Sequence, residues 1–342
     1  MHFICRLSSI PLMLACMRRL QAGSADRADF LALLDHPDYQ FERRRFGTRL
    51  PNAEGLADYL MALPQHPPEE AIGCLALRQH HPLMLRCYDQ PQRYEALYES
   101  LQRRLTQGMD SIAAMVERGL EPGMSDGMVP EVISTISIGP SFGYAFEGCI
   151  HFDLLGLGEH GEANMLERIV AHELHHAIFG PWLQRLRASF DPVERFLSEF
   201  AAEGLAIKFC NNAAGVHTRP VEPDQPVNAG LDAFTLNYLN GHFAEAAARL
   251  RETLHRLDAG EMGPQALQAE LEGYWLSPWT EEQSRDEVPR LLHSRVYTMG
   301  NELYGSVWDQ GGLEALYDCL RHPRRLLQRL PWLAEVKDVS AR

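Results

Sequence analysis

The residues of this sequence best suited to chemistry are His172, Glu173 and His176, which form the pattern HExxH. Four residues are slightly more than one helical turn, so both imidazoles can meet one metal ion. Glu173 then lies beside the metal, where its carboxylate can take a proton from an activated water. Two histidines and a third protein ligand leave one coordination position open, as in catalytic zinc sites. The motif therefore predicts a site for one Zn²⁺.

The segment around this motif predicts a helix by local rules. Asn164 and Glu167 form a capping pair at its start, and Gly180 followed by Pro181 marks its expected end. Between them, apolar residues recur at helical spacing at Leu166, Ile169, Val170, Leu174, Ala177 and Ile178. Unpaired imidazoles among such apolar neighbours would be costly to bury, which favours a metal site over a surface helix rich in His and Glu.

The third ligand has to come from outside this motif. The longer pattern HExxHxxGxxH is excluded, because positions 179 and 182 are Phe and Trp. Asp191 and the following Pro predict the start of a helix through 210, which carries Glu199 and Glu203 four residues apart. One of these carboxylates can bind the metal while the other orients a ligand histidine.

HELHH, together with the EGLA that begins at Glu203, resembles the gluzincin class of metallopeptidases. It is similar to the predicted bacterial zinc-dependent peptidases in which HExxH precedes a helix with E-G-L-A or E-G-F-A. The resemblance covers about 165–207, and more faintly 129–164. It implies that Glu203 is the third zinc ligand, whereas the long spacing of 203 − 176 = 27 residues keeps Glu199 as an alternative.

Two segments before the motif helix are expected to be strands, EVISTISI and GCIHFDLL. The class has an edge strand to which an extended peptide adds through backbone hydrogen bonds, and 148–154 is the expected edge strand here. His151 and Asp153 share one face of it, and we interpret them as a polar pair near a turn rather than as part of the site.

An oxyanion donor is expected from the segment LLHSRVYTMGNELYG near the C-terminus. His293, Tyr297 and Tyr304 share one helical face, and Gly300 would allow that helix to approach its neighbours closely. Tyr297 is the first candidate and His293 the second; the alternative is a buried packing face.

The composition limits the class of partner. The chain has 342 residues and a net charge of −14, which disfavours nucleic acid and anionic membranes as partners. Arg43–Arg45 are interpreted as a solvated face rather than a binding patch. Seven scattered cysteines without a CxxC pair favour reduced thiols, so we expect a cytoplasmic protein.

The expected fold is α+β and mostly helical, with a small sheet next to the HExxH helix. A helical N-terminal lobe would span 1–120, and a zincin-like catalytic region with a C-terminal helical lobe 121–342. Further helices are expected at 231–258, 264–274, 286–309 and 313–330.

The predicted function is a zinc metallopeptidase acting on peptides or proteins, with Glu173 as general base. The alternatives are a non-catalytic metal-binding or partner-binding protein and a zinc hydrolase of a non-peptide amide or ester.

Overall fold

The computed structural model describes residues 1–140, 143–159, 165–225, 233–277 and 293–334. The predicted cap at Asn164 and the start of the predicted helix at 286 lie outside these residues. The described part is mostly helical with one small mixed sheet, so the predicted α+β class is confirmed. No helix among the described residues is long and apolar enough to cross a membrane.

By contacts, the chain divides into two compact units, Met1–Ala113 with Gly127–Ala177, and Ala114–Asp126 with Ile178–Arg342. The predicted lobes divide the chain at one position, whereas each of these units combines two segments. Helices α6 (Pro91–Arg118) and α8 (Met165–Arg187) begin in the first unit and end in the second.

The first unit contains the sheet, whose strand order is β1-β2-β4-β3. These strands are β1 (Ile4–Arg6), β2 (Glu131–Thr135), β3 (Gly143–Phe146) and β4 (Cys149–Asp153). β2 is parallel to both β1 and β4, while β3 is antiparallel to β4. Both predicted strands are confirmed, but β4 is an inner strand, so the prediction that 148–154 forms the edge was wrong. The edge beside it is β3, since a two-residue turn at Glu147 and Gly148, both with positive φ, folds β3 back onto β4.

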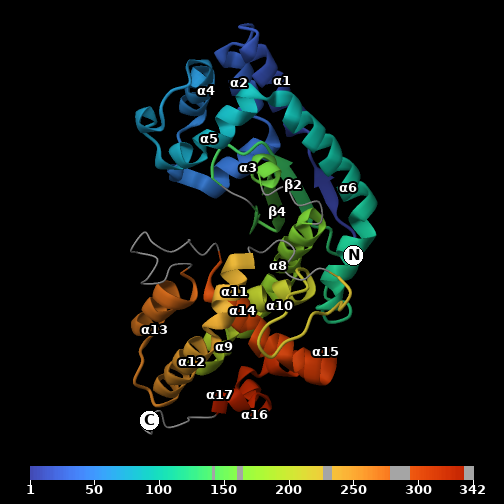
Figure 1. Ribbon diagram of the computed structural model, residues 1–342, viewed down its shortest axis with the longest axis vertical. Helices are drawn as coiled ribbons and strands as arrows, with labels where there is room; N and C mark the ends of the chain where they lie inside the picture. Colours follow the sequence, from blue (N-terminus) through green and yellow to red (C-terminus); the bar gives the residue numbers. More distant parts are fainter. Residues whose placement is uncertain (141–142, 160–164, 226–232, 278–292, 335–342) are drawn as a thin grey trace. The chain divides into compact units, whose positions relative to one another are not determined.

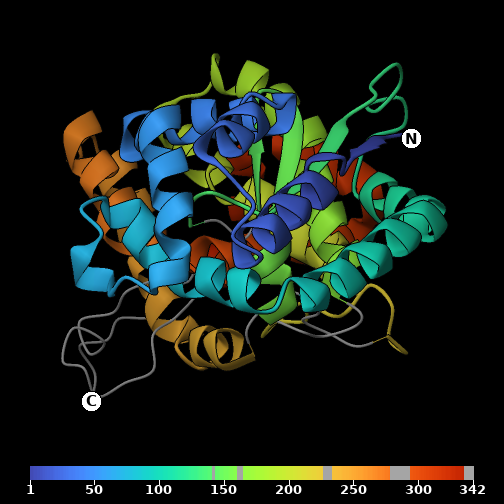
Figure 2. The ribbon, with the colours of Figure 1, turned by 90° about the horizontal axis from the view of Figure 1, so that it is seen from above.

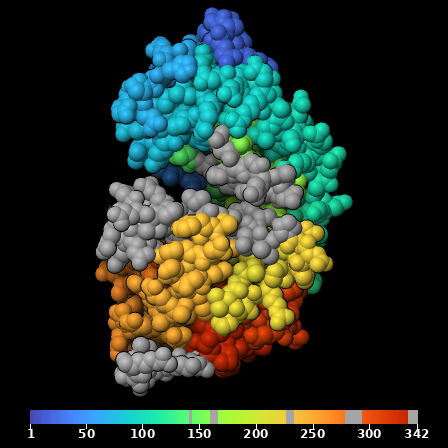
Figure 3. All heavy atoms as spheres, in the orientation of Figure 1, coloured from blue at the N-terminus to red at the C-terminus, as the bar shows by residue number. Residues whose placement is uncertain are grey.

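One face of the sheet is covered by α3 (Pro37–Phe46). Phe41 packs with Ile133 and Tyr144, and the Tyr39 hydroxyl donates to the Ile136 carbonyl at 3.1 Å. Figure 2 shows the blue N-terminal helices lying over the green strands. In the view of Figure 3, blue to teal residues form most of the surface of this unit. Its other helices are α1 (Ser9–Gln21), α2 (Arg27–Leu34), α4 (Ala53–Ala62), α5 (Leu75–Asp89) and α7 (Leu154–Glu159).

The motif helix α8 is longer than predicted, because Pro181 lies inside it. Proline removes one backbone hydrogen bond and often ends a helix. Here Phe179 and Leu183 on either side are both buried. Tertiary packing therefore offsets the lost bond, and the helix continues to Arg187.

The second unit is helical in its described part (Figure 1). The predicted helix from 191 to 210 is two helices, α9 (Pro192–Ser198) and α10 (Ala201–Phe209), and the capping box at Asp191 and Glu194 is present. The segment 295–321 is α14 (Arg295–Gly300), the π-helix η6 (Asn301–Gly305) and α15 (Ser306–Arg321). The other elements are α11 (Ala233–Gly241), α12 (Phe243–Asp258), α13 (Pro264–Glu270), η4 (Leu271–Trp275), η7 (Pro323–Arg325), α16 (Leu326–Arg329) and α17 (Pro331–Ala334).

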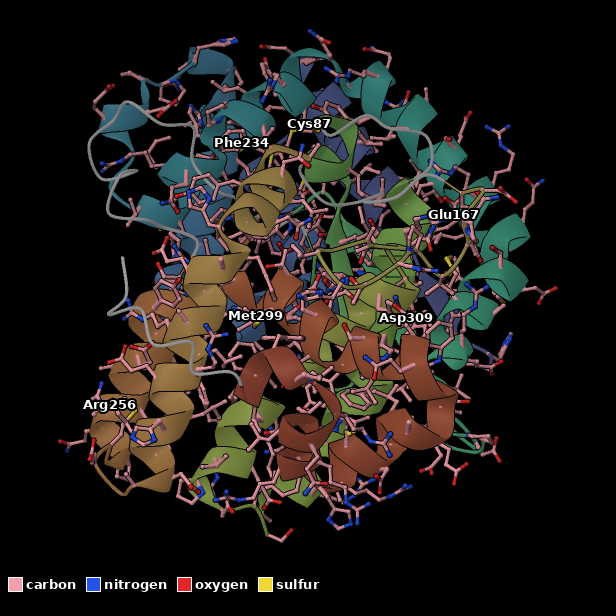
Figure 4. All side chains as sticks on the ribbon, turned by 60° about the horizontal axis from the view of Figure 1, so that its bottom comes forward. Cys87, Glu167, Phe234, Arg256, Met299 and Asp309 are labelled. Carbon is pink, nitrogen blue, oxygen red and sulfur yellow. The ribbon has the colours of Figure 1, made fainter. Side chains whose placement is uncertain are left out.

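A buried ion pair joins α10 to α15. The Lys208 ammonium donates to Asp309 Oδ2 at 2.8 Å and to the Arg219 carbonyl, and the Lys208 side chain is fully buried. Burial lowers the pKa of Lys208, which the Asp309 carboxylate counteracts. Asp309 and Met299, labelled in Figure 4, lie on α15 and α14.

Candidate functional site

His172 and His176 lie one turn apart on α8, as predicted. Their Nε2 atoms are 3.0 Å apart, and their rings meet edge to face at 83°. Two nitrogens bound to one tetrahedral zinc at about 2.0–2.1 Å would be roughly 3.3 Å apart. The observed separation of the two Nε2 atoms is therefore close to that of two nitrogen ligands of one ion.

Glu173 follows His172 on the same helix and is half-buried. A Cβ atom added at Gly143 of the edge strand β3 would lie 3.6 Å from Glu173 Oε1. That Cβ atom would also lie 3.2 Å from the Phe152 ring, so glycine at this position allows the backbone of β3 to lie close to Phe152 and Glu173.

The free side of β3 presents backbone groups next to Glu173. In a hairpin with a two-residue turn, Phe146 and Cys149 form the hydrogen-bonded pair next to the turn. Because bonded and non-bonded pairs alternate, Tyr144 also bonds to β4, whereas the N–H and C=O groups of Gly143 and Ala145 point to the open edge. No strand covers this edge among the described residues.

Glu203 lies in the first turn of α10 and is half-buried. One ligand nitrogen of each motif histidine and one carboxylate oxygen of Glu203 lie within 4.8 Å of one another. These three residues are the only such group of potential metal ligands among the described residues. Their donor set, two imidazoles and one carboxylate, is one that binds catalytic zinc.

Glu199 has a different partner. Its Oε2 atom lies 3.2 Å from Nη2 of Arg187. The same guanidinium donates to the Ser198 carbonyl at 2.6 Å and to Ser198 Oγ at 2.8 Å. Arg187 therefore directs the Glu199 carboxylate toward the end of α8.

Two glycines bring α14 against α10. A Cβ atom at Gly204 would lie 2.1 Å from the carbonyl carbon of Gly300, so the two backbones are in direct contact. This explains the glycine of the EGLA segment and agrees with the close approach expected at Gly300. Tyr297 lies one turn before Gly300, and its ring meets that of His293 at 5.0 Å, with both side chains half-buried.

Tyr304, which was expected on the same helical face as Tyr297, makes a structural contact instead. It is fully buried, and its hydroxyl donates to the Leu197 carbonyl at 3.1 Å. It therefore anchors α9. His80 and His81 are likewise buried, and they contact the Ser137 and Pro67 carbonyls, respectively, at 2.9 Å.

A buried polar cluster between α3 and the sheet was not found by sequence reasoning. Glu42 accepts hydrogen bonds from Ser137 Oγ, from the Ile138 N–H at 3.0 Å and from Thr135 Oγ1 at 3.2 Å. Thr135 Oγ1 also lies 2.8 Å from His151 Nε2. Burial raises the pKa of Glu42 to about 8, against the effect of the Ser137 hydrogen bond, and lowers that of His151 to about 3.

His151 and Asp153, interpreted from the sequence as a polar pair near a turn, are both fully buried and belong to this region. Asp153 accepts three backbone N–H groups, from Ser137, Leu155 and Gly156, each at 3.0 Å. Its carboxylate thus holds the segment after β2 against the start of α7. In the sequence, His151 and Asp153 are polar positions that alternate with apolar residues along β4. No local pattern indicated that Glu42 lies next to them.

Comparison with known proteins places the chain in a family. No curated protein and no solved structure matches it. Residues 128–329 match the model of the family described as "Putative zinc dependent peptidase (DUF5700)". This region contains the HExxH helix, Glu203 and Tyr297, and it is more than half of the 342 residues. The chain therefore belongs to this zinc-dependent peptidase family.

Proposed function

We propose that this protein is a zinc peptidase in which His172, His176 and Glu203 hold one zinc ion and Glu173 is the general base. The observation that carries the proposal is the convergence of two Nε2 atoms 3.0 Å apart with a carboxylate oxygen of Glu203 inside the same 4.8 Å group. The engagement of Glu199 with Arg187 supports Glu203 as the ligand. Zinc bound there would polarise the substrate carbonyl and lower the pKa of a water molecule.

Glu173 accepts the proton of the attacking water and passes it to the leaving amine. Its position next to His172 on α8, close to Gly143 of the edge strand β3, supports both transfers. The Tyr297 hydroxyl donates to the oxyanion, with His293 as the second candidate donor. Gly204 and Gly300 support this assignment, because their contact holds α14 against the helix that carries Glu203.

The peptide substrate adds to β3 as a further strand. Gly143 and Ala145 offer the backbone donors and acceptors, and Gly143 brings that strand beside Glu173. A substrate held through its own backbone is a peptide rather than a small ester or amide. This feature favours a peptidase over the other hydrolases that share the same zinc ligands.

The test is zinc content by elemental analysis together with cleavage of a mixed peptide library. Wild type should contain one zinc per chain and cleave peptides. Glu173→Gln should keep zinc and lose about 10²- to 10⁴-fold in kcat. Glu203→Gln should weaken zinc binding by more than about a hundredfold, since it removes a direct ligand, whereas the matched variant Glu199→Gln should retain the metal.

Two results would overturn the proposal. A wild-type protein that binds no stoichiometric metal would make the HExxH motif a coincidence. A zinc-bound protein whose activity does not change in Glu173→Gln would remove the general base from the mechanism. Loss of zinc in Glu199→Gln but not in Glu203→Gln would reassign the third ligand.

A further inference from the structure

A basic groove lies on the first unit, where α3 ends and α4 begins. Its volume is about 590 Å³, and it is lined by α3, by the 3₁₀ turn η1 (Gly47–Arg49) and by the residues that lead into α4. Its only charged lining residues are Arg43 and Arg44, and Leu50 and Pro51 supply apolar surface. On a chain of net charge −14, a groove with two cations and no acid in its lining selects for an anion.

The three consecutive arginines of α3 have different environments. The Arg45 guanidinium lies 4.9 Å above the ring of Tyr144, so it packs on the sheet. Arg44 pairs with Glu147 Oε2 at 3.0 Å, with both side chains about half exposed. Arg43 takes part in no ion pair or side-chain hydrogen bond of the described residues. The groove therefore contains one uncommitted guanidinium and one held by an exposed pair, which contributes little energy.

The partner of Arg44 connects the groove to the edge strand. Glu147 is the first turn residue after β3, so its contact with Arg44 places one lining residue of the groove next to the end of β3. From Gly143 to Phe146 the strand advances on the order of 10 Å, at about 3.4 Å per residue. A peptide bound along this edge beside Glu173 would reach the groove about three or four residues from the cleaved bond.

We propose that this groove binds an acidic side chain of the peptide substrate and thereby sets a preference for Asp or Glu at that distance from the cleaved bond. A carboxylate matches the planar fork of a guanidinium, and its methylene stem fits the surface of Leu50 and Pro51. Glu147 already places one carboxylate on Arg44, so it competes with the substrate for this cation. The inference rests on the proposed peptidase function.

Binding is measured on zinc-loaded Glu173→Gln protein, so that no cleavage is needed. The probes are two fluorescein-labelled decapeptides that differ only in an Asp-Glu or an Asn-Gln pair, followed by fluorescence anisotropy. The acidic peptide should bind about three- to tenfold more tightly at low salt, and the difference should shrink as salt is raised.

Variants in this background test the residues. Arg43→Ala and Arg44→Ala should each remove most of the preference for the acidic peptide. Glu147→Gln should increase it about twofold, because it releases Arg44. Arg103→Ala is the matched control, since Arg103 is exposed on α6 and does not line the groove. It should leave the preference unchanged.

Equal affinity for the two peptides, or equal effects of Arg43→Ala and Arg103→Ala, would overturn the proposal. The proposal would also be overturned if inorganic phosphate binds the groove while the two peptides bind equally well, because the groove would then be only an anion site. A chain that cleaves peptides but shows no acidic preference would disprove the groove and leave the peptidase intact. If acidic peptides bind through Arg43 but the wild-type protein cleaves no peptide, the groove is supported and the peptidase function is disproved.

Discussion

Glu42 should make the first unit less stable as pH rises, and Glu42→Gln should remove this dependence. The carboxyl group is fully buried between α3 and the sheet, and burial raises its pKa from 4.5 to about 8. Glutamine has nearly the same shape. Its carbonyl oxygen can accept from Ser137 and Ile138, and its amide can donate to Thr135.

The sign follows from proton binding. Below pH 4.5 the folded and unfolded states both hold the proton. Between 4.5 and about 8 the unfolded state releases it while the folded state keeps it, so the free energy of unfolding falls with rising pH. The slope is about 1.4 kcal/mol per pH unit, and the whole window corresponds to about 5 kcal/mol at most. Above the folded pKa the curve becomes flat again.

The measurement is urea unfolding of wild type and Glu42→Gln at pH 5, 6, 7 and 8. Hydrogen exchange of the β2 amides reports on the first unit specifically. The difference between the two proteins cancels the titrating groups that do not interact with Glu42. Glu99→Gln, which changes an exposed acid on α6, should keep the wild-type profile. A difference between wild type and Glu42→Gln that stays constant from pH 5 to 8 would refute the reasoning.

Three other changes should have defined effects. Gly204→Ala places a methyl group 2.1 Å from the Gly300 backbone and should destabilise the second unit by about 1–3 kcal/mol in denaturant unfolding; unchanged stability would show that the helices separate freely. Tyr297→Phe should keep stoichiometric zinc and lower kcat about 10- to 1000-fold, and an unchanged kcat would assign the oxyanion donor elsewhere. Lys208→Met removes the ion-pair partner of Asp309 and should lower the free energy of unfolding by about 2 kcal/mol, most of which Asp309→Asn should restore in the double variant.

Local patterns were sufficient for the parts of the site that lie on one helix. Residues four apart share a helical face whatever surrounds them, so the placement of His172 and His176 followed from the spacing alone. The capping box at Asp191 is equally local, because its two partners are three residues apart. The strand segments were also predicted, since the alternation of apolar and polar residues and the presence of β-branched residues are visible within a few positions of the sequence.

Features that depend on distant residues were not accessible in this way. Whether β4 is an inner strand or an edge depends on β3 folding back over it, and the pairing order is a property of the whole sheet. The end expected at Pro181 was wrong because the burial of Phe179 and Leu183 outweighs one lost hydrogen bond.

The sequence by itself determined the mostly helical α+β class, the motif helix and the residue types that can hold zinc. Only the tertiary structure decided that Glu199 pairs with Arg187, that Gly204 meets Gly300 across two helices, and that Glu42 is buried under the sheet. The reason is physical: helix periodicity and capping arise from neighbours along the chain. Burial, ion pairing and backbone contact arise from residues that folding brings together.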